Sequence, residues 1–315
     1  MTNKVIIITG PTASGKSDIA IEIAKIFDGE IISADSQQVY RYMDIGTNKI
    51  KNDHGITHHM IDIINPDDNF SVEDFSNRAQ ELISEINHKG KVAIVAGGTG
   101  FYIDSLLFNM NYGKVEKNLK FRKNLEKISL EEGNEYIYNK LVEIDPVTAK
   151  KYHPNETNRI IRALEIYDAT GKPASEVRKG EKKLKDSIKP LLFFLNYNDR
   201  SGIYEKINNR VLDMLDQGLI EEFRYLVKNY NLSKDSQSMA AIGYKEIFPF
   251  TDGEIDIDQL TNLIQKNTRH YAKRQVTWMK RYLRYDFAHE IIMDNLSKNE
   301  AADLIISLIK DNYEF

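Results

Sequence analysis

Cysteine is absent from the 315 residues of this sequence. Its absence excludes disulfide bonds and any zinc or iron–sulfur site with cysteine ligands. No apolar run approaches the roughly 18 residues that a membrane-spanning helix needs. The first residues lead directly into a strand, and we expect no signal peptide there. We therefore expect a cytoplasmic protein that has no membrane partner.

An excess of basic charge is also missing. The chain has 43 lysines and arginines against 47 acidic residues, a net charge of −4. Any binding of nucleic acid must therefore depend on local patches of charge. Hydrophobic residues make up 41% of the chain, and no low-complexity tract is present. This composition is typical of an ordinary folded protein, and the length favours about two domains.

Short β-branched runs alternate with amphipathic segments in the first hundred residues. We predict strands at 4–9, 30–34, 91–96 and 191–195, with a further candidate at 60–64. Helices are expected at about 16–27 and after Ser71, where Asp74 completes the spacing of a capping box. Strands that alternate with helices predict an α/β fold, with a parallel sheet covered by helices on both faces.

Residues 114–180 differ from this pattern because they contain no convincing strand, only charged amphipathic segments. A short apolar run typical of a strand follows at 191–195. The rest of the chain is predicted to be mostly helical, with a long helix at about 258–284. We therefore predict a core domain made of residues 1–112 and 190–315. Residues 113–189 are predicted to form an all-helical insertion domain.

The sequence Gly10-Pro-Thr-Ala-Ser-Gly-Lys-Ser17 lies between a predicted strand and a predicted helix. In that context the pattern is typical of a P-loop, as found in nucleotide- and ATP-binding proteins. Its backbone N–H groups and the helix N-terminus attract phosphate, Lys16 adds a full positive charge, and Ser17 is a candidate Mg²⁺ ligand. The strand at 91–96 ends in Gly97 and Gly98 and not in a metal-binding Asp, which argues against an ATP-driven motor or switch.

Asp35 follows the second predicted strand, at the sheet edge where open α/β folds bind their ligands. A carboxylate there can act as a general base or as a metal partner. The alternative is that Asp35 only caps the following turn. The amide and hydroxyl groups of Ser36, Gln37 and Gln38 are suited to the edge of a base.

Residues 266–284 contain seven lysines or arginines and no acidic residue. At helical spacing, the basic side chains of Lys266, Arg269, Lys273, Lys280 and Arg284 form one stripe, roughly opposite Tyr271, Trp278 and Tyr282. A basic stripe backed by aromatic residues favours contact with a phosphate backbone, although a solvated basic face is the alternative. The adjacent His58 and His59 are interpreted as structural and not as a metal pair.

Several sequence blocks, taken together, resemble one family. They are Gly10–Ser17, Asp35–Tyr40, Gly55–Pro66, Phe70–Phe75, Gly97–Tyr102, Asn158–Glu165, Ala241–Glu246 and Tyr271–Trp278. In this order they are similar to the tRNA dimethylallyltransferases, also called tRNA isopentenyltransferases, of the bacterial type. The resemblance extends over residues 4–284, about nine-tenths of the chain.

The resemblance implies transfer of a dimethylallyl group from dimethylallyl diphosphate to N6 of adenine 37, in tRNAs that read codons beginning with U. It implies that Asp35 is the general base and that Thr99 and Arg210 are also catalytic. Mg²⁺ is the implied cofactor, with Ser17 as its protein ligand. The implied diphosphate-binding residues are Gly10, Thr12, Ala13, Ser14, Gly15, Lys16 and Ser17.

The implied macromolecular partner is a tRNA anticodon stem-loop, and the protein is expected to be a monomer. Adenine 37 must leave its stack to reach the site, at a cost of a few kcal/mol. The implied tRNA-binding residues are Asp35, Ser36, Gln37, Gln38, Thr99, Arg122, Arg159, Arg162, Lys273 and Arg274.

Three alternatives remain open from the sequence. A small-molecule or nucleoside kinase would use the same loop for ATP and Asp35 to activate a hydroxyl. An adenylate isopentenyltransferase would modify free nucleotides and would not need the insertion with its arginines. A nucleotide-dependent RNA-binding protein would perform no transfer chemistry.

Overall fold

The computed structural model describes residues 2–50, 53–110, 115, 118–178 and 183–313. The chain forms two compact units, one of Met1–Leu107 with Lys185–Phe315 and the other of Phe108–Leu184. The predicted boundary at 112/113 lies outside the described residues, and the other, at 189/190, lies inside the strand Ile188–Asn196. The observed division therefore comes several residues earlier at both ends.

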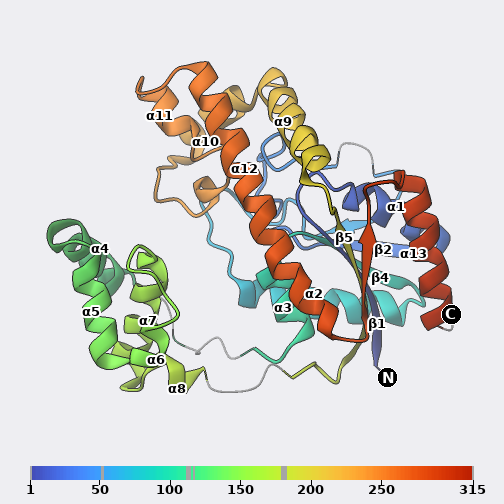
Figure 1. The fold of residues 1–315 in the computed structure, drawn as a ribbon, viewed down its shortest axis with the longest axis horizontal. Helices are drawn as coiled ribbons and strands as arrows, with labels where there is room; N and C mark the ends of the chain where they lie inside the picture. The colour runs from blue at the N-terminus through green and yellow to red at the C-terminus, as the bar shows by residue number, and fades with distance from the viewer. Residues whose placement is uncertain (1, 51–52, 111–114, 116–117, 179–182, 314–315) are drawn as a thin grey trace. The chain divides into compact units, whose positions relative to one another are not determined.

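The first unit is built on one six-stranded sheet with the order β3-β2-β4-β1-β5-β6, and every pairing in it is parallel (Figure 1). The parallel sheet expected from the alternating pattern is thus confirmed. Its strands are β1 (Asn3–Thr9), β2 (Gly29–Ser33), β3 (His58–His59), β4 (Val92–Gly97), β5 (Ile188–Asn196) and β6 (Ala288–Ile292).

Helices connect and cover these strands, as parallel pairing requires. The helices of the first unit are α1 (Lys16–Ile26), α2 (Val72–His88), α3 (Gly100–Leu107), α9 (Arg200–Asp216), α10 (Leu219–Tyr230), α11 (Ile247–Thr251), α12 (Ile257–Met279) and α13 (Lys298–Asn312). Short 3₁₀ turns occupy Ser238–Ala240 and Lys280–Arg284. The capping box at Ser71 and Asp74 forms as predicted and begins α2.

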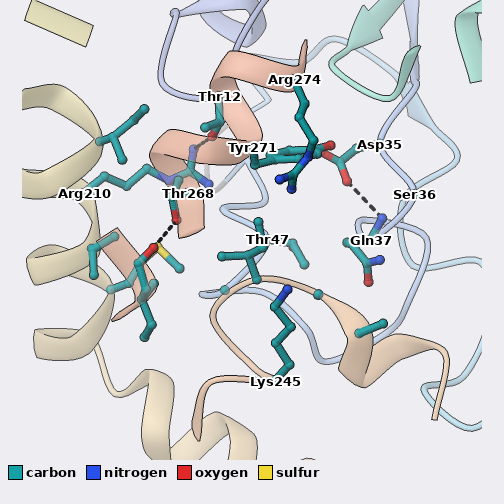
Figure 2. Close-up of a pocket in the computed structure, with 18 residues that line it drawn as sticks. Thr12, Asp35, Ser36, Gln37, Thr47, Arg210, Lys245, Thr268, Tyr271 and Arg274 are labelled. Carbon is teal, nitrogen blue, oxygen red and sulfur yellow. Dashed lines mark hydrogen bonds between the residues drawn. The ribbon is translucent and has the colours of Figure 1, made fainter. Parts of the chain in front are cut away.

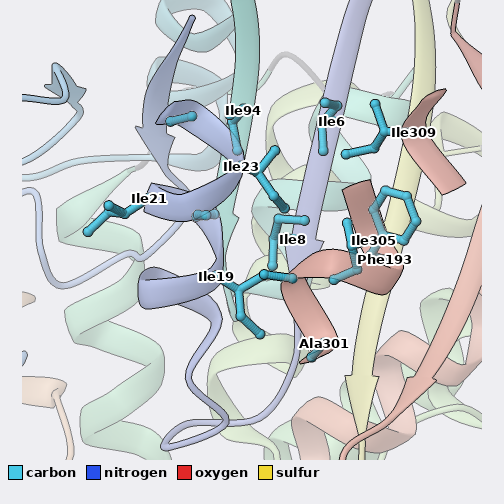
Figure 3. Packing of buried hydrophobic residues seen from close by; sticks show 14 of the residues in the cluster. Ile6, Ile8, Ile19, Ile21, Ile23, Ile94, Phe193, Ala301, Ile305 and Ile309 are labelled. Carbon is cyan, nitrogen blue, oxygen red and sulfur yellow. The ribbon is translucent and has the colours of Figure 1, made fainter. Parts of the chain in front are cut away.

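The core follows from the two-residue period of the strands. Ile6 and Ile8 of β1 lie on one face, and Phe193 of β5 packs with them because Ile8 and Phe193 are paired neighbours in the sheet. Helices α1 and α13 cover this face with Ile19, Ile23, Ile305 and Ile309 among others (Figure 3). The intervening residues of β1 point to the opposite face, where α2 contacts β1 and β4.

A second core lies among α9, α10, α11 and α12. Val211, Phe223 and Leu260 belong to it, together with Val39 and Tyr40 from the segment that follows β2. The C-terminal helices therefore pack on the chain just beyond Asp35. This packing places α9 and α12 beside the carboxyl ends of the strands.

The second unit consists of helices only, in the part that the structure describes. Its helices are α4 (Leu119–Glu132), α5 (Asn134–Ile144), α6 (Pro146–Ala149), α7 (Thr157–Thr170) and α8 (Ala174–Val177). They surround their own small core, which includes Leu125, Ile137, Leu141 and Ile160. None of the helices that the structure describes, in either unit, is long and apolar enough to span a bilayer.

The structure differs from two expectations for secondary structure and adds one strand. The strand predicted at 60–64 is absent, since β3 is only His58–His59 and Ile64 makes a single bridge to Tyr40. Positive φ angles of 65° at Met60 and 56° at Asp62 prevent an extended run there. The long helix ends at Met279 and continues as a 3₁₀ turn to Arg284. The edge strand β6 was not predicted at all.

Candidate active site

The loop Gly10–Ser17 connects β1 to α1, so its backbone faces the carboxyl edge of the sheet. Gly15 takes a φ of +83° as the N-cap of α1, a conformation that favours glycine. Gly10 must also lack a side chain, because a Cβ there would lie 2.9 Å from the carbonyl oxygen of Leu195. The N–H groups of the first turn of α1 are thus available to an anion.

Lys16 projects from the start of α1 and donates to the carbonyl of Pro11 at 3.3 Å. Burial lowers the pKa of its ammonium group to about 8; Asp35 opposes this shift, and Arg210 adds to it. Lys16 and Arg210 lie close together, and their two positive charges exceed the single negative charge of Asp35. Binding a polyanion would satisfy both cations.

Arg210 comes from the middle of α9, far along the chain from the loop, yet its guanidinium donates to Oγ1 of Thr12 at 2.9 Å. The amide N–H of Thr12 in turn donates to Oε1 of Gln275 on α12 at 2.8 Å. Gln275 then donates from Nε2 to the carbonyl of Gly98 at 3.0 Å. Two helices of the C-terminal half thereby fix the P-loop against the Gly97–Thr99 turn.

Asp35 and Thr99 lie side by side at the ends of β2 and β4. The hydroxyl oxygen of Thr99 accepts from the N–H of Ser36 at 3.1 Å, and Oδ1 of Asp35 accepts from the N–H of Gln37 at 2.9 Å. Gly97 allows this approach, since a Cβ there would be 2.3 Å from the carbonyl oxygen of Ala34. The turn-capping bond expected as an alternative role for Asp35 is therefore present, and Oδ2 is left over for chemistry.

A cavity of about 250 Å³ opens beside Asp35, and we call it the central cavity (Figure 2). Its polar lining includes Asp35, Ser36 and Gln37, and its apolar lining comes largely from α9 and α12. The residues involved are Thr12, Asp35, Ser36, Gln37, Gly46, Thr47, Ile207, Arg210, Val211, Met214, Ala240, Ala241, Ile242, Lys245, Ile264, Thr268, Tyr271 and Arg274.

A second hollow, of about 580 Å³, lies along the P-loop, and we call it the loop cleft. It is lined by residues 13–18 of the loop and by basic side chains of α9 and α13, namely Lys206, Arg210 and Lys298. Lys298 is paired with Asp18, which reduces its free charge. Arg210 lines both hollows and so connects the base-like carboxylate to the phosphate loop.

Tyr271 was not among the predicted site residues, although it lies in one of the sequence blocks. It lines the central cavity on α12, where burial raises the pKa of its phenol above the usual value, Asp35 acts in the same direction, and hydrogen bonds to Thr99 and Gln275 oppose the shift. The phenol therefore stays protonated at neutral pH. The sequence signal that could have found Tyr271 is its spacing from Ile264 and Thr268, since these three positions share one helical face.

Gln37 and Gln38, predicted together as readers of a base, lie in different surroundings. Gln37 lines the central cavity, and its buried Oε1 has no hydrogen-bond partner among the described residues. Gln38 instead accepts from the Ser33 hydroxyl at 2.8 Å and donates to the carbonyl of Thr47 at 3.2 Å. Gln37 thus lines the cavity, while its unpaired Oε1 is itself buried.

The two basic residues predicted on α12 also separate. Arg274 lines the central cavity, with its guanidinium 5.7 Å from the ring centre of Tyr271. Lys273 lies on another side of the helix, beside a small hollow of about 20 Å³ that also contacts Tyr197. Of these two residues, only Arg274 lines the central cavity.

The histidine pair has structural partners. His59 forms a 2.8 Å hydrogen bond between Nε2 and the carboxylate of Glu30, and His58 bonds through Nδ1 to the carbonyl of Ile56 at 2.8 Å. Among the residues that the structure describes, no group of three or more histidine or acidic side chains has the geometry to hold a metal ion. Any Mg²⁺ in the loop cleft would then depend on Ser17, phosphate oxygens and water.

Two of the three arginines predicted in the helical unit bind one buried carboxylate. Glu165 accepts from Arg122 at 2.7 and 2.8 Å and from Arg162 at 2.6 Å. These bonds outweigh the effect of burial and lower the pKa of Glu165 to about 2. Arg159 is more exposed and pairs with Glu156 at 2.6 Å. Of the three, Arg159 offers the most accessible charge.

Replacing Glu165 by glutamine is expected to destabilise the helical unit by about 3 kcal/mol, because it removes the negative charge that two partly buried arginines share. In the native protein, the ionised carboxylate of Glu165 contributes its full stabilisation above pH 4.5, the ordinary pKa of the group. This stabilisation is lost as the pH falls towards about 2, the pKa in the folded protein. The variant should lack that pH-dependent loss. The free energy of unfolding, measured with urea from pH 6 to pH 2, tests this expectation. The control is Glu131→Gln, because Glu131 is exposed and lies 3.7 Å from its partner Lys127.

Similarity to known proteins agrees with this geometry. The family model described as IPP transferase matches residues 38–282. A protein named tRNA dimethylallyltransferase from Thermoanaerobacter sp. (strain X514) is 45% identical over 304 residues, covering 95% of both chains. One of the same name from Clostridioides difficile (strain 630) is 43% identical over 313 residues, 98% of both. The chain belongs to the IPP transferase family.

Solved structures of this family have the same fold. The tRNA isopentenylpyrophosphate transferase of Staphylococcus epidermidis is 39% identical, with a TM-score of 0.71 and coverage of 99% of this chain and 100% of that one. A eukaryotic dimethylallyltransferase described as acting on tRNA is 30% identical, with a TM-score of 0.81 and coverage of 99% and 79%. The family resemblance drawn from the sequence blocks is therefore confirmed.

Proposed function

We propose that this chain transfers a dimethylallyl group from dimethylallyl diphosphate to N6 of adenine 37 in tRNAs that read codons beginning with U. The products are N6-dimethylallyladenosine at that position and diphosphate. The protein acts as a monomer in the cytoplasm. The observation that supports this reaction best is Arg210, which lines both the central cavity and the loop cleft.

Two hollows that meet at one arginine suit a transfer between two substrates. The central cavity has a carboxylate, the polar side chain of Gln37 and an apolar wall, which suit an adenine and a prenyl chain. The loop cleft has the helix N-terminus and Lys16, which suit a diphosphate. The bond to be broken would lie between them, near Arg210 and Thr12.

The reaction forms a bond between N6 of adenine and C1 of the dimethylallyl group while the bond from C1 to the diphosphate oxygen breaks. The N6 proton passes to the carboxylate of Asp35, which compensates for the weak nucleophilicity of an exocyclic amine. Negative charge develops on the leaving diphosphate, and Lys16, Arg210 and the loop N–H groups stabilise it. Thr99 keeps the Asp35–Gln37 turn in place through Ser36.

Mg²⁺ fits the donor set of the loop cleft. Ser17 lies on its lining, and a hard cation that retains several waters needs few protein ligands when phosphate oxygens are present. When bound, the ion would neutralise charge on the diphosphate. Ser17 would provide the protein ligand, and Lys16 would remain the direct ammonium contact.

The RNA contacts divide between the two units. In the first, Asp35, Ser36 and Gln37 face the extruded base, Gln38 supports them, and Lys273 and Arg274 contribute positive charge. In the helical unit, Arg159 is available to phosphate, and Glu165 presets the orientation of Arg122 and Arg162. Arginine groups fixed by a carboxylate recognise a phosphate with little further loss of side-chain entropy.

Purified protein with Mg²⁺ and dimethylallyl diphosphate is expected to alkylate an anticodon stem-loop with adenines at positions 36 and 37. Mass spectrometry of the digested RNA measures the added C₅H₈. Parallel reactions contain ATP in place of the isoprenoid donor, or AMP in place of RNA. Consumption of ATP with unmodified RNA would identify a kinase, and modified AMP would identify an adenylate isopentenyltransferase; either result contradicts the proposal.

A further inference from the structure

The segment Asp44–Thr47 forms part of the wall of the central cavity, to which it contributes Gly46 and Thr47 (Figure 2). This segment belongs to no helix or strand; it is a turn closed by backbone hydrogen bonds from Asn48 to Ile45 and from Lys49 to Asp44, both at 3.0 Å. A cavity wall made of loop must be held by side chains from elsewhere if it is to bind a ligand in one geometry.

One carboxylate, that of Glu222 on α10, holds this wall by its backbone. Oε2 of Glu222 accepts from the N–H groups of Asp44 at 2.9 Å and Ile45 at 2.8 Å. Oε1 accepts from the N–H of Gly46 at 3.2 Å. Three successive backbone N–H groups directed at one anion form a nest, an arrangement that requires negative charge.

Tyr244 completes the arrangement. Its hydroxyl donates to Oε1 of Glu222 at 2.6 Å, and its ring packs directly on Gly46. A Cβ on Gly46 would lie 2.3 Å from that ring, so this contact requires glycine. With four donors, the carboxylate of Glu222 uses its full acceptor capacity of about four lone-pair sites.

The wall also contacts the segment that faces the base. The carbonyl of Thr47 accepts from Nε2 of Gln38, whose Oε1 accepts from Ser33 at the end of β2. Gln38 is the neighbour of Gln37, which lines the cavity. A shift of residues 44–47 would therefore be transmitted through Gln38 towards Gln37 and Asp35. The segment also reaches the rim of the loop cleft through Asn48, whereas residues 10–17 have no hydrogen bond to Glu222 among those described.

We propose that Glu222 is a positioning residue that sets the base side of the central cavity without touching the substrates. The inference rests on the proposed function, because it assigns the two sides of the site to two substrates. Glu222 would then affect the use of the RNA and leave binding of the diphosphate group unchanged. A residue that only stabilised the fold would affect both alike.

The test is Glu222→Gln, which keeps the shape but replaces one acceptor oxygen with a donor that faces backbone N–H groups. We expect kcat/KM for the anticodon stem-loop to fall about tenfold or more, the usual effect of losing hydrogen bonds to a charged group. The Kd for inorganic diphosphate, measured by calorimetry, should stay within about twofold of the native value. Tyr244→Phe removes one donor only and should give a smaller fall in the same parameter.

Glu221→Gln is the matched control, because Glu221 is the exposed neighbour whose ion-pair contact is Arg224 at 3.6 Å. It should leave both measurements unchanged. Equal losses for RNA and diphosphate, or no loss at all in Glu222→Gln, would overturn the positioning role. Should Glu222→Gln fail to fold, Tyr244→Phe decides by the same two measurements. An inactive native protein would instead refute the proposed function, and the inference with it.

Discussion

Asp35→Asn is expected to lower kcat for RNA alkylation by about 10²–10⁴, the range usually contributed by a general base. Asparagine has the same shape as aspartate, and its Oδ1 can still accept from the N–H of Gln37, as Asp35 does at 2.9 Å. The turn should therefore persist while the proton acceptor is lost. Single-turnover measurement with saturating stem-loop and dimethylallyl diphosphate isolates the chemical step.

The same variant separates catalysis from binding. We expect its Kd for the stem-loop to remain within about threefold of the native value, because one uncharged substitution removes no cation from the RNA surface. Asp67→Asn, an exposed residue outside the site, is the control and should keep full activity. A variant of Asp35 that retained native kcat would exclude its role as the base.

Lys16→Ala is expected to reduce kcat/KM for dimethylallyl diphosphate by about 10²–10³, as is common when one group that stabilises developing charge is removed. The fall should appear with short and long RNA substrates alike, because Lys16 lies in the loop cleft. Steady-state kinetics with the donor varied at saturating stem-loop measures it. Lys310→Ala, at the far end of α13, provides the control.

The pH dependence of the same lysine gives a second measurement. Burial, with Arg210 adding to it and Asp35 opposing it, lowers the pKa of Lys16 to about 8. Its ammonium form, which binds the anion, therefore predominates below pH 8 and is lost above it. The Kd for inorganic diphosphate should rise as the pH passes 8, and Lys16→Arg should flatten that rise, since arginine stays charged. Identical pH profiles in the two proteins would rule out this assignment.

Four of the strands, the helix α1 that follows the Gly10–Ser17 loop and the capped helix α2 could be predicted because their signals are local. A β-branched run followed by glycine and a helix start is visible within about 20 residues of sequence. Strand β6 could not be found in this way, as only Ile291 is buried in it and its ladder partner is β5, far away in the chain. Its extended form is decided by tertiary pairing and not by propensity.

The residues of the candidate site also divide into those with a local signal in the sequence and those without one. Asp35 and Lys16 follow from their places after strands, whereas Arg210 was assigned through family resemblance alone. Its contact with Thr12 joins residues 198 positions apart, and no pattern in either segment records it. Tyr271 and Gln275 were not predicted, because the charge pattern of α12 marks its basic residues and carries no signal for its uncharged ones. Gln275 bonds to Thr12, and Tyr271 lines the central cavity.

The junction between the two units has a consequence for the history of the fold. Lys185 donates its N–H to the carbonyl of Leu107 at 2.9 Å, and just beyond it Phe108 and Leu184 form an antiparallel bridge. The chain thus leaves the first unit and returns to it at neighbouring residues. The entropic cost of closing a loop grows only with the logarithm of its length. The size of the helical unit therefore has little effect on the free energy of pairing β1 with β5. This is a place where a segment can be lengthened, shortened or exchanged over evolutionary time while the β1–β5 pairing stays intact.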